Sequence, residues 1–373
     1  MRAILLTLVM LFPVLARAQY TPPNQLLGRA ITEQQRGELP AAIRDYRAVL
    51  AAQPKNLAAL VNLGAALARN GQLPEAITEY EAALKLSPNI ESIHLDLGLA
   101  YLSENNLKAA RAQFSAAHQI NPTDVRVAIL LGNAEARTGE APEAVAMLQP
   151  MAAANAGNSD FDYVLGESLV WANELKQGAA LLEKSAAMSN SAESWMFAGT
   201  VELNMEQFNE ARSDFDNAMK INSHIPKLCT MDGIAHDKDD DAKGAEPAFR
   251  EALQQDPNDY EANLYLGSIL YKNRQMPEAK TYLDKALALK PKSRMAQYEL
   301  AMWESTSGHL HAAATRLEAL EKAAPTWINP HVQLSLIYYR LHQPADGKRE
   351  REIVAKLRAE QRKTNVTNAG LYR

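Results

Sequence analysis

The sequence repeats itself with a period of about 34 residues from roughly Pro23 almost to the C-terminus. Position eight of the repeat is small, mostly as glycine: Gly64, Gly98, Gly132, Gly166, Gly199, Gly233 and Gly267. Position twenty is Ala or Gly throughout, and position twenty-four is large and apolar, as in Tyr80 and Phe114. A period of this length over most of the chain predicts one elongated array of stacked repeats without an independent second domain.

Each repeat has the pattern of a helix, a tight turn and a second helix. In the repeat that begins at Leu57, apolar residues follow the 3.6-residue period on either side of a break at Asn70 and Gly71. Two helices approach closely only where one of them lacks a side chain, so the small residues leave room for the bulky residue at position twenty-four. A closing proline, as at Pro88, cannot continue a helix and marks the passage into the next repeat.

These features resemble the tetratricopeptide repeat (TPR) family over nearly all the chain after its first twenty or so residues. The best matches are residues 57–90, 91–124 and 260–293. The resemblance implies an all-α fold, a TPR-type solenoid in which antiparallel helix pairs form a right-handed superhelix. It also implies that the first helix of each repeat lines the concave surface, where members of the family usually bind peptides or proteins.

We expect about ten repeats within residues 19–363, the last of them ending in a capping helix, and a flexible tail over 364–373. The expected repeats are 23–56, 57–90, 91–124, 125–158, 159–191, 192–225, 226–259, 260–293, 294–327 and 328–363. Residues 151–161 lack the closing proline, and the repeat that follows is one residue short, so a bend or a loosened interface is expected there. Asp232 stands where a leucine is usual, which predicts a less stable repeat.

The first eighteen residues have the pattern of a secretory signal peptide. Arg2 supplies the positive start, residues 4–15 an apolar core, and Ala16 and Ala18 the small residues of a cleavage site before Gln19. An uncleaved anchor is the alternative, but the apolar run is short for a membrane span. We therefore expect an exported protein, periplasmic or secreted, without a transmembrane segment in the mature chain.

Composition narrows the class of protein further. The only cysteine, Cys229, cannot form an intramolecular disulfide, so the fold must depend on helix packing. The formal net charge of −5 does not favour a nucleic-acid partner. The C-terminal stretch 348–363 mixes basic and acidic residues around an apolar stripe, as a capping helix requires, although a contact with an anionic membrane or partner is an alternative.

The sequence carries no recognisable catalytic motif: no nucleophile elbow, phosphate-binding glycine loop or metal-ligand spacing. The acidic turn 236–241 lacks the glycine and the final glutamate of a calcium loop, so a solvated turn is expected. His309, His311 and His342 fall at neighbouring turns, where exposed histidines are favoured over a metal site. His94 and His331 are expected to be hydrogen-bonded structural residues. We thus predict no enzyme, cofactor or metal.

The candidate partner-binding residues are those at the concave positions that the TPR resemblance implies, namely two, five, nine, twelve and thirteen. From the middle of the chain onward these positions are aromatic or polar, as is typical of binding surfaces. The candidates are Arg126, Asn133, Arg137, Tyr163, Glu167, Trp171, Tyr271, Tyr298, Met302 and Tyr339. For any one aromatic residue, packing against a neighbouring repeat is the competing interpretation.

The leading hypothesis is a non-catalytic scaffold of the bacterial cell envelope that binds a protein or peptide on its concave face. The alternative from another class is glycan or peptidoglycan binding in polysaccharide export or envelope assembly, with Tyr163, Trp171, Tyr271 and Tyr298 as stacking platforms. An enzyme with a site built across the groove would need a cluster of carboxylates or histidines with perturbed pKa values.

Overall fold

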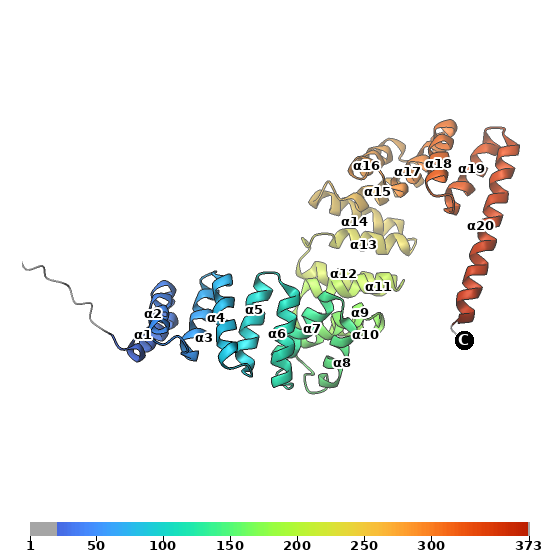
Figure 1. The fold of residues 1–373 in the computed structure, drawn as a ribbon. Helices are drawn as coiled ribbons and strands as arrows, with labels where there is room; N and C mark the ends of the chain where they lie inside the picture. Colours follow the sequence, from blue (N-terminus) through green and yellow to red (C-terminus); the bar gives the residue numbers. More distant parts are fainter. Residues whose placement is uncertain (1–20, 372–373) are drawn as a thin grey trace, which may run out of the picture. The chain divides into compact units, whose positions relative to one another are not determined.

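The computed structural model describes residues 21–371, with side chains as far as Arg362. The predicted signal peptide, residues 1–18, lies outside this part of the chain. The described residues form α-helices and one short 3-10 helix, arranged in two compact units that divide between Asn155 and Ala156 (Figure 1). We name them unit 1 and unit 2 in chain order.

Unit 1 is built from four antiparallel helix pairs, each made of a first and a second helix joined by a tight turn. The first helices are α1 (Pro23–Gln35), α3 (Leu57–Arg69), α5 (Glu91–Ser103) and α7 (Val125–Thr138). The second helices are α2 (Leu39–Ala52), α4 (Leu73–Leu86), α6 (Leu107–Ile120) and α8 (Ala141–Leu148). A 3-10 helix, η1 (Gln149–Met151), follows α8, which ends early because Pro150 cannot donate the next helical hydrogen bond.

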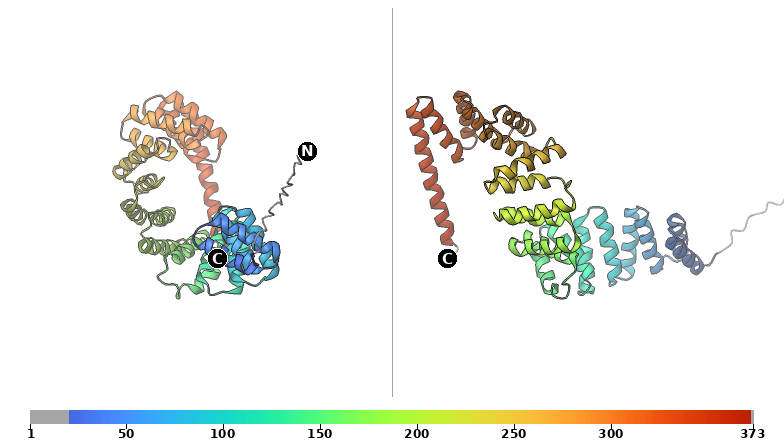
Figure 2. Two further views of the ribbon diagram at one scale, coloured as in Figure 1. Left: turned by 90° about the vertical axis from the view of Figure 1, so that its left-hand side faces the viewer. Right: turned by 180° about the vertical axis from the view of Figure 1, so that it is seen from behind.

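Unit 2 continues the same alternation, and its helix pairs follow one another along a curve (Figure 2). Its first helices are α9 (Ser159–Trp171), α11 (Ala192–Asn204), α13 (Leu228–Lys238), α15 (Tyr260–Lys272), α17 (Arg294–Thr306) and α19 (Ile328–Arg340). Its second helices are α10 (Leu175–Ser189), α12 (Phe208–Ile221), α14 (Ala242–Gln255), α16 (Met276–Leu289), α18 (Leu310–Ala323) and α20 (Pro344–Leu371). The all-α, TPR-type fold expected from the sequence is confirmed.

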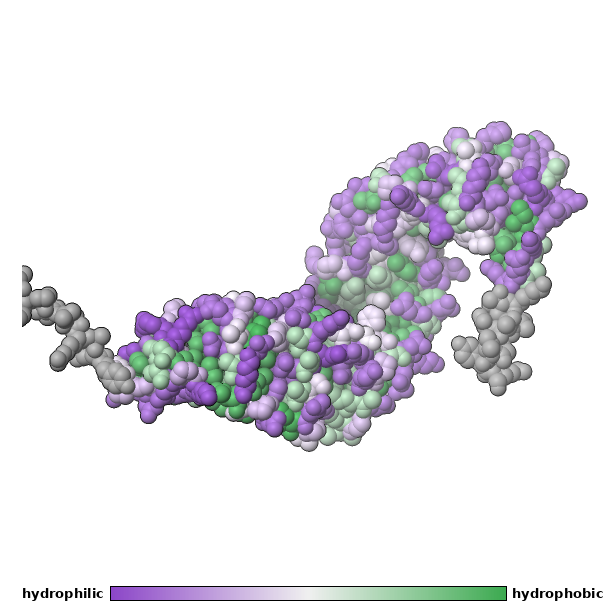
Figure 3. Space-filling model, viewed as in Figure 1, coloured by the Kyte–Doolittle hydropathy of each residue, from purple (hydrophilic) through white to green (hydrophobic). Residues whose placement is uncertain are grey.

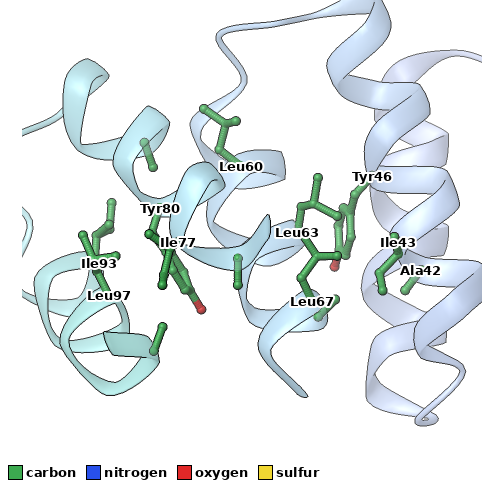
Figure 4. Close-up of a cluster of buried hydrophobic side chains, with 14 of the residues drawn as sticks. Ala42, Ile43, Tyr46, Leu60, Leu63, Leu67, Ile77, Tyr80, Ile93 and Leu97 are labelled. Carbon is green, nitrogen blue, oxygen red and sulfur yellow. The ribbon is translucent and has the colours of Figure 1, made fainter. Parts of the chain in front are cut away.

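The packing rule inferred from the sequence is visible in the distances between helices. A Cβ atom added to Gly98 would lie 2.5 Å from the ring of Phe114, and one added to Gly64 would lie 2.8 Å from the ring of Tyr80. Position eight must therefore be small wherever an aromatic ring fills position twenty-four. Figure 4 shows Tyr46 beside Leu63 and Leu67 in the resulting core of unit 1.

The turn inside each pair carries a residue with positive φ at position fifteen of the repeat. Glycine, which adopts this conformation without strain, supplies it in some repeats, but others use asparagine or a larger residue. The residues are Gly37, Gly71, Asn105, Gly139, Asn173, Glu206, Asp240, Arg274, Gly308 and His342. This left-handed residue reverses the chain, so the two helices of each pair run antiparallel.

Two segments differ from a regular repeat. Residues 152–157 form turns between η1 and α9, in the stretch that lacks the closing proline, and the division between the units falls within them. At the C-terminus, α20 continues to Leu371, through most of the residues expected as a flexible tail. No proline or glycine between Lys348 and Ala369 interrupts it.

Candidate protein-binding surface

The first helices of unit 2 form the surface on which most of the candidate residues lie. Neighbouring first helices contact each other directly, α11 with α13, α13 with α15 and α15 with α17, in addition to their own second helices. Such contacts place the first helices on the inner side of the curve of unit 2. Figure 3 shows apolar residues on this hollowed side of the unit.

Helix α9 presents the clearest group of candidates. Tyr163, Glu167 and Trp171 are spaced four residues apart and therefore share one face of the helix. Trp171 is 63% exposed, the largest exposed fraction among the large hydrophobic residues that the structure describes. Tyr163 is half-buried, with its ring centroid 6.4 Å from that of Phe197. Burial, with the carboxylates of Glu167 and Glu193, raises the pKa of Tyr163, so its hydroxyl stays protonated.

Tyr271 differs from the prediction because the structure buries it. Its side chain is only 7% exposed, and its hydroxyl donates a hydrogen bond to Glu299 Oε2 at 3.0 Å. Burial and the Glu299 carboxylate raise the pKa of this tyrosine. The residue joins α15 to α17 instead of offering a ring to a partner, because the next first helix covers position twelve in this repeat.

The candidate side chains of α17 and α19 already contact other side chains of unit 2. The ring of Tyr298 is 5.2 Å from that of Trp327, and Met302 is half-buried in the core around α15 and α17. Tyr339 is 36% exposed, with the Arg351 guanidinium 4.4 Å from its ring centroid. Tyr339 thus combines an exposed ring with a neighbouring positive charge.

Three candidates belong to α7 of unit 1. Arg126 is exposed and pairs with Asp124 at 2.7 Å, and Arg137 is exposed near the end of the helix. Asn133 is half-buried. These three residues belong to unit 1, whereas the helices α9 to α19 belong to unit 2.

Two exposed apolar residues on first helices of unit 2 are not among the candidate residues. Met295, at position two of its repeat, is 48% exposed, and Leu336, at position nine, is 50% exposed. Both occupy positions that the repeat register marks as concave, so the register alone could have found them. The candidates chosen from the concave positions are mainly aromatic or polar, whereas Met295 and Leu336 are aliphatic.

Three of the histidines singled out in the sequence contact neighbouring groups in the structure. His94 and His331 are hydrogen-bonded as expected, each with Nε2 donating to a proline carbonyl and with Nδ1 close to a side chain of the following second helix. The ring centroid of His309 lies 6.0 Å from that of Trp303.

The lone cysteine, Cys229, is buried beside a pocket of about 290 Å³. Burial raises its thiol pKa, which disfavours the nucleophilic thiolate.

Comparison with known families decides the family of the chain. Models described as tetratricopeptide repeat match residues 27–91, and residues 67–134, 101–167 and 238–302. The chain is a TPR protein. TPR proteins bind protein partners, and the exposed first-helix surface of this TPR array is therefore its candidate binding site.

Solved structures of TPR-like arrays are similar to this chain at low identity. A TPR protein from Parabacteroides merdae has a TM-score of 0.49 and 16% identity, covering 65% of this chain and 97% of its own. The Cut9–Hcn1 structure of the APC/C has a TM-score of 0.49 and 11% identity, covering 91% and 94%. Yeast Tom70 has a TM-score of 0.38 and 14% identity, covering 90% and 92%.

A search among curated proteins found no match to this TPR chain. Among the residues that the structure describes, no helix is both long and apolar enough to cross a membrane.

Proposed function

We propose that this TPR protein is a non-catalytic scaffold of the bacterial cell envelope that binds a protein or peptide on the first-helix surface of unit 2. The observation that carries the proposal is the exposed Trp171, which shares a face of α9 with Tyr163 and Glu167. A large aromatic ring left in solvent beside polar groups is typical of residues that dominate binding energy in protein interfaces.

The proposal that the protein is exported is based only on the signal-peptide pattern of residues 1–18. Cleavage after Ala18 would leave a mature chain that begins at Gln19. The test is to express the whole chain in its native host and to measure the N-terminus of the fractionated protein by mass spectrometry. A periplasmic or secreted form that begins at Gln19 supports the proposal, and an intact Met1 in the cytoplasmic fraction overturns it.

The binding surface is tested by affinity purification of the mature chain from its native host with quantitative mass spectrometry. Trp171→Ala, alone and with Tyr163→Ala, should lower the recovery of a stoichiometric partner at least about tenfold, as expected for a buried aromatic anchor. Met188→Ala is the matched control, because Met188 is also apolar and is 44% exposed but lies on the second helix α10. It should recover the partner as the wild type does.

A partner recovered equally by wild type and the Trp171→Ala variant would overturn this location of the site.

The glycan alternative is weakened because Tyr271 is buried and Tyr298 packs against Trp327, which removes two of its proposed stacking platforms. A saturable change in tryptophan fluorescence with soluble peptidoglycan fragments, in place of protein capture, would revive it.

A further inference from the structure

Three carboxylates from three helices of unit 2 converge at one point. Glu183 of α10, Glu202 of α11 and Asp214 of α12 each offer an oxygen, and these oxygens all lie within 4.8 Å of one another. The three helices are neighbours in Figure 1, where the repeat 159–191 meets the repeat 192–225. No part of the partner-binding surface proposed above includes these residues.

Two of the carboxylates each have one buried oxygen without a hydrogen-bond partner. Glu202 and Asp214 are each only 5% exposed, and Glu202 Oε2 and Asp214 Oδ2 have no hydrogen-bond partner. Lys184, next to Glu183 in sequence, pairs instead with Asp162 at 2.8 Å, and Arg212 pairs with Asp239 and Asp241. Within residues 21–362, no ion pair joins any of the three carboxylates to a lysine or arginine. Buried charges of one sign need a compensating positive charge.

In other repeats, the carboxylates at the corresponding positions receive a hydrogen bond from an arginine or a tyrosine side chain. In the repeat 294–327, Glu304 at position eleven pairs with Arg316 at position twenty-three at 2.7 Å. In the repeat 192–225 the same two positions hold Glu202 and Asp214, so an acid replaces the arginine. A tyrosine is the donor elsewhere: Tyr101 donates to Glu81 at 2.7 Å, and Tyr338 donates to Glu318 at 2.8 Å. Between Glu183, Glu202 and Asp214 no arginine or tyrosine of the described chain takes this place. If the three carboxylates stay ionised, only an external cation can neutralise them.

We propose that Glu183, Glu202 and Asp214 bind a hard divalent cation of the Ca²⁺ type. Ca²⁺ prefers oxygen ligands at about 2.4 Å and tolerates irregular geometry, and ligands on opposite sides of such an ion are separated by about 4.8 Å. A set made only of carboxylates disfavours zinc, which selects nitrogen and sulfur ligands. Glu183 is half-buried and gives the ion a path from solvent. The bound ion joins α10, α11 and α12 and so stabilises the contact between two repeats.

The test is calorimetric titration of CaCl₂ into the purified mature chain after removal of divalent ions with EDTA, together with thermal unfolding with and without Ca²⁺. The wild type should bind one Ca²⁺ per chain, and its unfolding temperature should rise with Ca²⁺ concentration. Glu202→Gln and Asp214→Asn should each weaken Ca²⁺ binding at least about tenfold by removing a charged ligand. In EDTA both variants should unfold at or above the wild-type temperature, because each removes an uncompensated charge.

Two further variants sharpen the experiment. Asp214→Arg restores the pairing seen between Glu304 and Arg316, so it should abolish Ca²⁺ binding while the protein stays folded in EDTA. Glu135→Gln is the matched control, because Glu135 is a half-buried glutamate at position eleven of the repeat 125–158 and should leave Ca²⁺ binding unchanged.

Absence of saturable Ca²⁺ binding by the wild type would overturn the proposal and indicate that a proton shared among the carboxylates neutralises the cluster. Undiminished Ca²⁺ binding by both Glu202→Gln and Asp214→Asn would also overturn it, because the ion would then bind elsewhere.

Discussion

At the scale of single residues, the array depends on close contact between a small residue of one helix and a ring of its partner. Gly98 faces Phe114, Gly64 faces Tyr80, and each ring occupies the space in which a Cβ atom would lie. The glycine is required by the neighbouring helix and not by its own backbone, since both residues lie inside regular helices. Such contacts are intolerant of even one added carbon atom.

We therefore predict that Gly98→Ala lowers the free energy of unfolding by about 1–3 kcal/mol, the usual cost of overpacking a core. Gly28→Ala is the control, because a Cβ atom at Gly28 in α1 would meet no atom within 4 Å. There the better helix propensity of alanine should raise stability by up to about 1 kcal/mol. Urea unfolding followed by circular dichroism measures both, and equal effects of the two substitutions would contradict the packing argument.

Asp232 is a second residue-scale feature, a buried carboxylate in α13 that is 7% exposed. Burial, with the charge of Asp216, raises its pKa from 3.8 to about 6, although His236 and Arg212 act in the opposite direction. Because the pKa of the folded state is the higher one, ionisation destabilises the fold as the pH rises from about 4 to about 6.

Asp232→Asn should thus stabilise the protein by about 1–2 kcal/mol at pH 8, and this gain should shrink as the pH falls through 6 and disappear below about pH 4. Unfolding curves of both proteins at pH 4, 6 and 8 provide the measurement. A gain that does not change with pH would show that the carboxylate charge is not its cause.

At the scale of secondary-structure elements, α20 is held against α19 by a buried polar pair. His331 Nδ1 lies 2.8 Å from Glu350 Oε2, and both side chains are almost fully buried. The first helix α5 uses the same register with a neutral partner, because His94 Nδ1 lies 2.8 Å from Gln113 Oε1. The same histidine position therefore accepts either a carboxylate or an amide.

The internal comparison predicts different outcomes for two substitutions. Glu350→Gln should cost less than about 1 kcal/mol, because glutamine already fills this position opposite His94. Glu350→Ala should cost about 3 kcal/mol, because it leaves the buried imidazole without its partner. Hydrogen exchange should show the loss of protection in α19 and α20. A cost for Glu350→Gln as large as that for Glu350→Ala would contradict the comparison.

At the scale of the whole molecule, the chain forms two units that divide between Asn155 and Ala156. The turns at residues 152–157 contain exposed alanines and Gly157, with a φ of 98°. Limited digestion with elastase, which cleaves after small residues, should cut here first and leave two fragments that remain folded. First cleavage inside a helix pair would argue against this division.

The sequence predicts the helix pairs and their packing because both depend on local periodicity and on residue size at fixed positions. It also draws attention to Trp171, whose place in the repeat register is enough to put it on a first helix. The burial of Tyr271 could not be predicted, because the neighbouring Glu299 and α17 decide it. The cluster of Glu183, Glu202 and Asp214 was equally hidden, since its members come from three helices and form no linear motif.

The central claim is that the face of α9 around Trp171 contacts a protein partner, and site-specific photo-crosslinking tests it most directly. A photoreactive phenylalanine analogue would replace Trp171 in one variant and Met188 of α10 in another, each produced in the native host. We predict a crosslinked product with one defined protein from position 171 and none from position 188. No product from position 171, or the same product from both positions, would contradict the claim.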